Sequence, residues 1–154
     1  MALKVVIDIE CNRLIKPDKI WVIVCKDIDT GKRFVFRNLT TDELERTRFV
    51  DFVSTCKLFI GHNLLGFDAP VLENLLGITF GDPGRNTIDT LIISKMADYP
   101  RSGHSIKDYG IEFELYKGDF TDWTHYSQEM EDYCIRDVDI CEKIYLKYAK
   151  FINN

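Results

Sequence analysis

The chain has 154 residues, 45% of them hydrophobic, and a formal net charge of −5. This length and hydrophobic content are enough to bury the core of one domain. The net negative charge excludes a protein that binds nucleic acid through a broadly basic surface. Any binding of nucleic acid is therefore expected to be local and weak.

The first apolar run, LKVVIDIEC, predicts a strand. Its alternation places the odd-numbered apolar residues on one face and Val6, Asp8 and Glu10 on the other. Because Asp8 and Glu10 are two residues apart, their carboxylates project from the same side of the strand. They are either the solvated face of an edge strand or a pair that shares a cation.

Two further strands are predicted by IWVIVC and RFVFR, with Asp29-Thr30-Gly31 between them as a hairpin turn. Three consecutive strands before any helix favour an antiparallel meander.

A helix is predicted to follow the meander. Thr40 and Glu43 have the spacing of a capping box, and Leu39 and Leu44 that of a hydrophobic staple. We therefore expect Leu44 on the buried face of this helix, together with Phe49.

The next elements are a short buried strand from Leu58 to Gly61 and a helix from about Asp68 to Leu76. Pro70 falls in the first turn of this helix, and Gly77 is its predicted stop. Asp68 either caps the helix or belongs to a site.

Another short strand is predicted to end at Ile88, after which Asp89 is expected to cap the helix TLIISKMA. A short helical piece, HSIKDY, is expected between Gly103 and Gly110. The following stretch, GIEFELYKGDFTDW, shows no clean period and is expected to be irregular.

A long closing helix is predicted to start near Ser127. Tyr133 and Asp137 are four residues apart and therefore neighbours on one helix face. That face is the apolar stripe, so Asp137 is misplaced for ordinary surface charge, whereas Asp139 falls away from the stripe and is expected to be solvated.

Four acids stand where apolar residues would be expected: Asp8, Glu10, Asp68 and Asp137. A carboxylate is costly to bury unless something compensates its charge. Hard divalent cations prefer oxygen ligands, and clustered carboxylates provide them. The pattern therefore predicts a site for divalent metal ions.

The order D-x-E, then H-N-x-x-x-F-D, then Y-x-x-x-D resembles the DEDD superfamily of 3′–5′ exonucleases. Within that superfamily the resemblance is strongest to the proofreading domain of phage family A DNA polymerases, and it extends from Val5 to about Tyr148. Tyr133, four residues before Asp137, matches the tyrosine (DEDDy) type, since Asp132 stands where the histidine type has its His.

The resemblance implies a ribonuclease H-like (DnaQ-like) α/β fold, with a central mixed sheet, an antiparallel meander and flanking helices, as a single 3′–5′ exonuclease domain over 1–154. It also implies two divalent cations, Mg²⁺ or Mn²⁺, about 3.5–4 Å apart. Asp8, Glu10 and Asp137 would hold the first. Asp8 would bridge to the second, which Asp68 supports, and Tyr133 would orient the attacking water.

By the same resemblance, Ile9, His62, Asn63 and Phe67 would border the terminal nucleotide of the substrate. Plain core packing is the alternative for Ile9 and Phe67. Stabilisation of the turn is the alternative for His62 and Asn63.

The expected function is removal of nucleotides from a single-stranded or frayed 3′ end of DNA, in proofreading or DNA processing. One alternative is a 3′–5′ exoribonuclease of the RNase D-like type, and another is a catalytically silent domain that binds DNA or a polymerase. The expected partners are the 3′ end of single-stranded DNA and, for a free-standing or separately encoded proofreading domain, a DNA polymerase.

Five cysteines without a C-x-x-C pair disfavour both structural zinc and a disulfide framework, so buried reduced thiols are expected. The apolar runs are too short to span a membrane, and no signal segment opens the chain. We expect no membrane partner and a cytoplasmic location, the host cytoplasm if the chain is phage-encoded.

Overall fold

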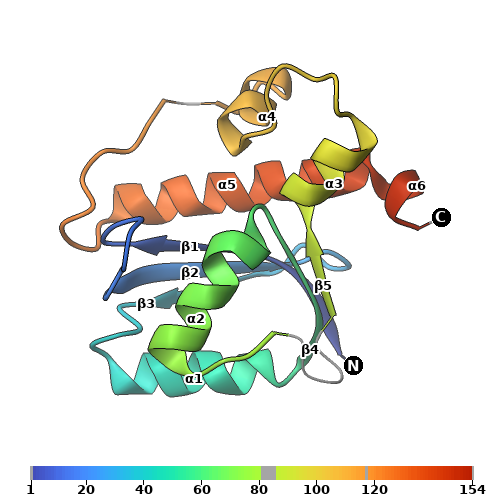
Figure 1. Ribbon diagram of the computed structural model, residues 1–154. Coiled ribbons are helices and arrows are strands. Elements are labelled where there is room, and N and C mark those ends of the chain that lie inside the picture. The colour runs from blue at the N-terminus through green and yellow to red at the C-terminus, as the bar shows by residue number, and fades with distance from the viewer. Residues whose placement is uncertain (1, 81–85, 117, 154) are drawn as a thin grey trace.

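A computed structural model describes residues 2–80, 86–116 and 118–153 as a five-stranded sheet with helices on both faces (Figure 1). The strands, in the spatial order β3-β2-β1-β4-β5, are β1 (Leu3–Cys11), β2 (Ile20–Asp27), β3 (Arg33–Arg37), β4 (Cys56–Gly61) and β5 (Asn86–Asp89). Strands β1 to β3 pair antiparallel, whereas β4 and β5 run parallel to β1. The predicted mixed sheet with an opening meander is confirmed.

The helices are α1 (Glu43–Val53), the π-helical turn η1 (Leu64–Asp68), α2 (Ala69–Leu76), α3 (Thr90–Ala97), α4 (Ile106–Glu112), α5 (Gln128–Lys147) and α6 (Ala149–Ile152). Helices α1 and α2 lie on one side of the sheet, and the long α5 crosses the other (Figure 1). Among the helices in the described ranges, none combines the length and apolar character needed to cross a membrane.

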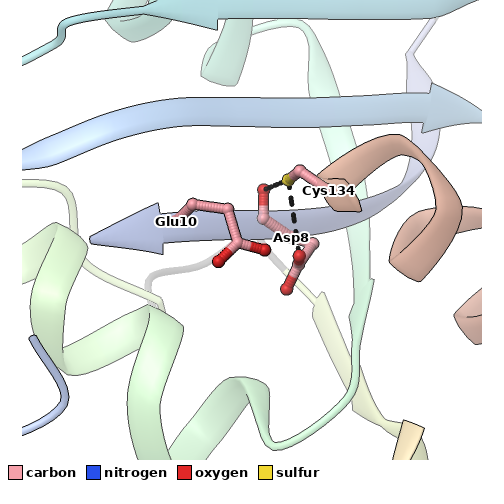
Figure 2. Close-up of side chains that lie close together, drawn as sticks. All are labelled: Asp8, Glu10 and Cys134. Atoms are coloured by element: carbon pink, nitrogen blue, oxygen red, sulfur yellow. Dashed lines mark hydrogen bonds between the residues drawn. The ribbon is translucent and has the colours of Figure 1, made fainter. Parts of the chain in front are cut away.

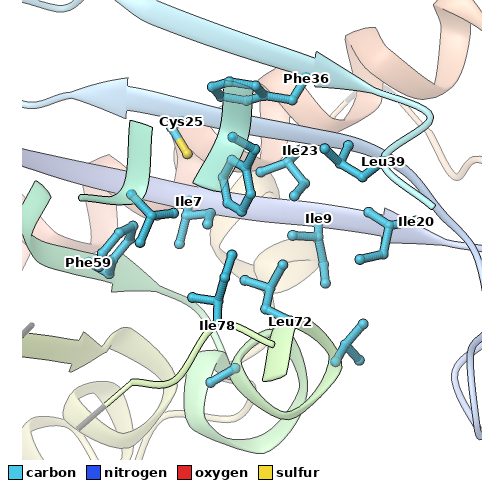
Figure 3. Packing of buried hydrophobic residues seen from close by; sticks show 14 of the residues in the cluster. Ile7, Ile9, Ile20, Ile23, Cys25, Phe36, Leu39, Phe59, Leu72 and Ile78 are labelled. Atoms are coloured by element: carbon cyan, nitrogen blue, oxygen red, sulfur yellow. The ribbon is translucent and has the colours of Figure 1, made fainter. Parts of the chain in front are cut away.

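The alternation of β1 divides the core into two parts. Val5, Ile7 and Ile9 pack against α1 and α2, where Phe49 and Leu72 are fully buried (Figure 3). Burial of such side chains contributes about 1.5–3 kcal/mol each. The predicted faces of β1 are therefore confirmed, and the face that carries Asp8 and Glu10 is turned toward α5.

Helix α5 is buried along most of its length because two layers cover it. Met130 and Val138 pack with Val6 of β1 on the sheet side. On the other side, Ile144 packs with Tyr109 of α4. Its side-chain directions are therefore fixed by packing as well as by the helix itself.

The start of α1 differs from the prediction. Its N-cap is Asp42, whose side chain accepts a hydrogen bond from the Glu45 backbone N–H at 3.2 Å, so the predicted capping box at Thr40 is wrong. The predicted staple is wrong too, because Leu44 is 83% exposed. Leu44 precedes Val53 by nine residues, about half a turn out of phase with the buried face.

Helix α4 also continues past the predicted stop at Gly110 and ends at Glu112. A methyl group at residue 110 would lie 3.1 Å from Cδ1 of Ile140 on α5. The glycine therefore serves the close packing of two helices rather than ending one.

The expectation that Asp139 is solvated is confirmed only in part, because its side chain is 30% exposed but is held in ion pairs. Its carboxylate pairs with Lys26 at 3.1 Å and with Arg33 at 2.8 Å. Both cations stand on the meander beneath α5, and their strands could not be placed against this helix from sequence alone.

The two substitutions Phe49→Ala and Leu44→Ala test the observed phase of α1. Phe49 packs edge-on against Phe36, with ring centroids 5.0 Å apart, so its loss should lower the free energy of unfolding by about 3–5 kcal/mol. Leu44→Ala should change it by less than about 0.5 kcal/mol. Urea denaturation measures both, and a comparable loss in Leu44→Ala would contradict the observed helix phase.

Candidate functional site

A pocket of about 590 Å³ opens beside the end of β1. All nine site residues predicted from the sequence line it: Asp8, Ile9, Glu10, His62, Asn63, Phe67, Asp68, Tyr133 and Asp137. They come from three parts of the chain, namely β1, the segment that joins β4 to α2, and α5. The fold therefore brings together residues that are up to 129 positions apart in the sequence.

The sheet register explains why the pocket forms here. Strand β4 pairs with β1 only as far as Val6 and Ile60, so Asp8 and Glu10 lie beyond the end of this pairing. The chain leaves β4 after Gly61 and turns through η1 beside the part of β1 that β4 does not pair with. The carboxyl ends of parallel strands are the usual position of ligand sites in open α/β sheets.

Asp89 stabilises this turn by hydrogen bonds to its backbone. Its carboxylate accepts backbone N–H groups from Asn63, Leu65 and Leu91, each at 3.0 Å. The predicted cap of α3 is therefore confirmed, and the same side chain also holds the turn that carries the site residues. Asn63 is in the left-handed region, with φ 59°, which an asparagine tolerates better than most residues.

Asp68 ends η1 and continues directly into α2 with helical backbone angles. Its side chain makes no capping hydrogen bond, so the alternative that it serves only as a cap is wrong. Asp68 is 4% exposed, and its Oδ2 has no hydrogen-bond partner among the described residues. Single π-helical turns are frequent at functional sites because the extra residue redirects the side chains beside it.

Helix α5 begins as predicted, with Ser127 accepting a hydrogen bond from the Met130 N–H at 3.1 Å. Asp137 lies one turn after Tyr133 and is 9% exposed, which rules out the alternative of an ordinary solvated charge. Its Oδ1 has no hydrogen-bond partner in the described part of the chain. The Nε atom of Arg136 lies 3.9 Å from that oxygen.

Figure 2 shows the centre of the cluster, where Asp8 and Glu10 on β1 meet Cys134 on α5. One ligand atom from each of the three lies within 4.8 Å of the others. The Cys134 thiol donates to Asp8, 3.4 Å from Oδ2 and 3.5 Å from the backbone oxygen.

The pKa values of all four carboxylates are raised, in each case first by burial. Burial raises the pKa of Asp8 to about 6. Burial, and next the charge of Asp8, raise the pKa of Asp137 to about 8 and that of Glu10 well above its ordinary value. Burial, and next the charge of Asp8, also raise the pKa of Asp68 well above its ordinary value. A cation among these oxygens would favour the charged forms, so the donor set fits a hard divalent ion.

His62 lines the pocket, but both of its ring nitrogens have protein partners. Nε2 donates to the backbone oxygen of His104 at 2.7 Å, and Nδ1 lies 2.9 Å from the hydroxyl of Thr90. Burial lowers the pKa of His62. These contacts support the turn-stabilising alternative for His62, whereas Asn63 is exposed at the pocket and its side-chain oxygen lies over Gly66.

Ile9 and Phe67 have two roles in the structure. Ile9 is 4% exposed and belongs to the core beneath the sheet, and the half-buried Phe67 packs against the same cluster. Both nevertheless form part of the pocket wall. Core packing and contact with a ligand are therefore compatible at these positions.

The sequence analysis missed five residues of the pocket lining: Cys11, Asn12, Arg13, Leu14 and Trp123. Trp123 lies in the stretch without a period, and its backbone oxygen accepts the indole N–H of Trp21 at 2.9 Å. Its ring centroid lies 6.0 Å from that of Tyr133. For Cys11, Asn12, Arg13 and Leu14, the one signal in the sequence was their proximity to the D-x-E motif.

Neither a protein-family model nor a curated protein sequence matches the chain. Solved structures match it by fold. The family B DNA polymerase from the hyperthermophilic archaeon Pyrobaculum calidifontis has a TM-score of 0.73 and 18% identity, over 98% of this chain and 25% of the polymerase. A nuclease in its apo form has a TM-score of 0.69 and 19% identity, over 96% of this chain and 73% of that one.

Brucella melitensis NrnC also matches, over 97% of this chain and 76% of NrnC. The form with bound Mg²⁺ has a TM-score of 0.59 and 19% identity, and the form bound to pGG has 0.62 and 18%. At such identities the likeness establishes the fold alone. This chain, which spans a quarter of the polymerase, has the α/β ribonuclease H-like fold that the sequence predicted.

Proposed function

We propose that this chain is a divalent-metal-dependent 3′–5′ exonuclease of the DEDDy type that removes nucleotides from single-stranded or frayed 3′ ends of DNA. One observation carries the proposal: four carboxylates from three distant segments converge on one pocket, and two of their oxygens have no partner among the described residues. A buried carboxylate is costly unless it is compensated, and cations are the compensation that this donor set suits.

Two Mg²⁺ or Mn²⁺ ions are the proposed cofactors. Asp8, Glu10 and Asp137 would hold one of them, and Asp8 and Asp68 the other. When bound, such a pair lowers the pKa of the attacking water and stabilises the departing oxygen of a phosphodiester. The Mg²⁺ bound to NrnC, which shares this fold, supports the choice of metal.

Tyr133 would hold the attacking water by a hydrogen bond. Burial, and next the charge of Asp137, raise the pKa of its hydroxyl above the ordinary value. The hydroxyl therefore keeps its proton at neutral pH and serves as a donor rather than as a base. Phe120, Trp123 and the guanidinium of Arg136 surround the ring and fix its direction.

The terminal nucleotide would occupy the pocket between the carboxylates and the aromatic side chains of Phe67 and Trp123. Stacking on aromatic rings tolerates every base and contributes about 1–3 kcal/mol per base, which suits an unpaired end. The polymerase among the matched structures supports DNA as the substrate and a polymerase as a partner, and the NrnC form bound to pGG keeps RNA as the second candidate. Because all five cysteines are unpaired and buried, we propose the reducing cytoplasm as the compartment.

The proposal is tested with end-labelled DNA and RNA of one sequence, each single-stranded or as a blunt duplex, in Mg²⁺, Mn²⁺ or excess EDTA. We expect stepwise loss of nucleotides from the 3′ end of single-stranded DNA, slower cleavage of blunt duplex, and none in EDTA. Faster cleavage of RNA would favour the exoribonuclease, and undiminished cleavage in EDTA would refute the metal-dependent mechanism.

Asp137→Asn, with Asp139→Asn as its matched control on the same helix, separates catalysis from structure. Asp137→Asn should slow cleavage by about 100-fold or more, because it removes a proposed metal ligand. Its melting temperature in EDTA should not fall, since the substitution removes a carboxyl group that is costly to bury. Asp139→Asn should retain its activity and lose at most about 1 kcal/mol of stability, because it weakens only pairs near the surface. If the two variants cleave equally fast, Asp137 is not a metal ligand.

The pH dependence of stability without metal gives an independent test of the cluster. The pKa of Asp137 rises from 3.8 to about 8 on folding, so between these values the folded state binds more protons than the unfolded state. This group should therefore make the protein less stable as the pH rises from about 4 to about 8. The measured quantity is the melting temperature of Asp137→Asn minus that of the unaltered protein. In EDTA this difference should increase as the pH rises over this range. Near pH 8, saturating Mg²⁺ should reverse its sign. A difference independent of pH would contradict the raised pKa of Asp137 in the folded protein.

A further inference from the structure

We propose that Cys134 makes the carboxylate cluster a binding site for a thiophilic divalent cation, Zn²⁺, which binds Asp8, Glu10 and the Cys134 thiolate and thereby inhibits the enzyme. The inhibition rests on the proposed nuclease function, whereas the binding of the ion does not. In the described part of the chain, these three residues are the one group of such side chains whose ligand atoms all lie within 4.8 Å of one another.

The distances fit a single ion. Zinc lies about 2.3 Å from a cysteine sulfur and about 2.0–2.2 Å from a carboxylate oxygen, so two such ligands in a tetrahedral site are about 3.5 Å apart. The Cys134 sulfur is 3.4 Å from Oδ2 of Asp8. As Figure 2 shows, the side chains of Cys134 and Asp8 already point toward one another, with the Glu10 carboxylate beside them. No backbone movement is needed to bring the sulfur and this oxygen to one ion.

A second, independent observation indicates a cation at this place. Oδ2 of Asp68 and Oδ1 of Asp137 are buried and have no hydrogen-bond partner among the described residues. Asp68 is 4% exposed, the side chain of Asp137 is 12% exposed, and both line the pocket beside Asp8 and Glu10. They add negative charge around the ion.

The thiol makes the site respond differently to hard and soft ions. Mg²⁺ and Mn²⁺ prefer oxygen ligands, so with these ions the Cys134 thiol keeps its proton and its hydrogen bond to Asp8. Zn²⁺ accepts thiolate ligands, and on binding it replaces the thiol proton, which passes to solvent. Since Asp8 is shared by both proposed cofactor positions, an ion held between Asp8 and Cys134 competes with the pair that supports hydrolysis.

The other cysteines provide matched controls. Cys141 is also buried on α5, but its sulfur lies 3.4 Å from the hydroxyl of Thr90. Cys11 lines the pocket but belongs to the opposite face of β1, in the core beneath the sheet. Neither belongs to the group that could share an ion.

Cobalt(II) is the probe for binding, because a thiolate bound to Co²⁺ gives a near-ultraviolet charge-transfer band that oxygen ligands do not give. The purified protein, Cys11→Ser and Cys141→Ser should show this band, and Zn²⁺ should remove it by competition. Cys134→Ser and Cys134→Ala should lack it, with folding checked by their melting temperatures. A missing band in the unaltered protein, its loss in either control, or its persistence in a folded Cys134 variant would overturn the proposal.

Inhibition is measured by titrating Zn²⁺ into single-stranded DNA cleavage at fixed Mg²⁺, with each variant referred to its own rate without zinc. Loss of one ligand should raise the half-inhibiting zinc concentration about tenfold or more in Cys134→Ser and leave it unchanged in Cys141→Ser. Equal zinc sensitivity of these two variants would overturn the inhibitory role. If the protein cleaves no nucleic acid with any metal, the proposed nuclease function fails, while the cobalt band still reports the thiolate site by itself.

Discussion

The rest of the structure depends on the cost of holding four carboxylates close together, with Asp8 half-buried and the other three buried. Asp8 and Glu10 cannot move apart, because β1 is hydrogen-bonded to β2 along both residues. Asp68 is fixed where η1 joins α2, and Asp137 is fixed by a helix that is packed on two sides. Because these elements hold the backbone at all four residues, the repulsion among their side chains is relieved by protons or, in the proposed function, by cations.

Neighbouring polar groups keep the rest of the pocket in position. Asp89 directs its charge at three backbone N–H groups, and charge-assisted bonds of this kind satisfy a buried carboxylate well. His62 links the end of β4 to Thr90 and to the loop at His104 through an uncharged ring. The groups that position the site are therefore satisfied within the protein, whereas one oxygen each of Asp68 and Asp137 has no hydrogen-bond partner among the described residues and would be available to a ligand.

Sequence alone predicted the parts of the fold that local patterns determine. The alternation in β1 and the spacing of Tyr133 and Asp137 fix side-chain directions before any tertiary contact forms, so the two sides of the candidate site were predictable. The predictions failed, or held only in part, where a distant element decides: Asp139 meets cations of the meander, and Gly110 meets Ile140 on another helix. The burial of Leu44 was predicted wrongly because the hydrophobic-staple pattern was given more weight than the helical phase of α1. That phase could be read from the sequence. Trp123 stands in an irregular stretch, where no period indicates which way a side chain points.

Cys134 shows how one position meets two requirements that conflict. Its surroundings in the core between β1 and α5 are apolar, with Val6, Met130 and Val138 in the same cluster, and a small hydrophobic side chain is favoured there. Its other neighbour is Asp8, whose Oδ2 needs a hydrogen-bond donor while no metal is bound. A thiol is apolar enough for the hydrophobic core, and it is a weak hydrogen-bond donor to Asp8. A serine hydroxyl would instead bring two acceptor lone pairs into this apolar core. The same compromise places a sulfur beside a carboxylate that we propose as a metal ligand, so the proposed response to soft metal ions would follow from how this core is packed.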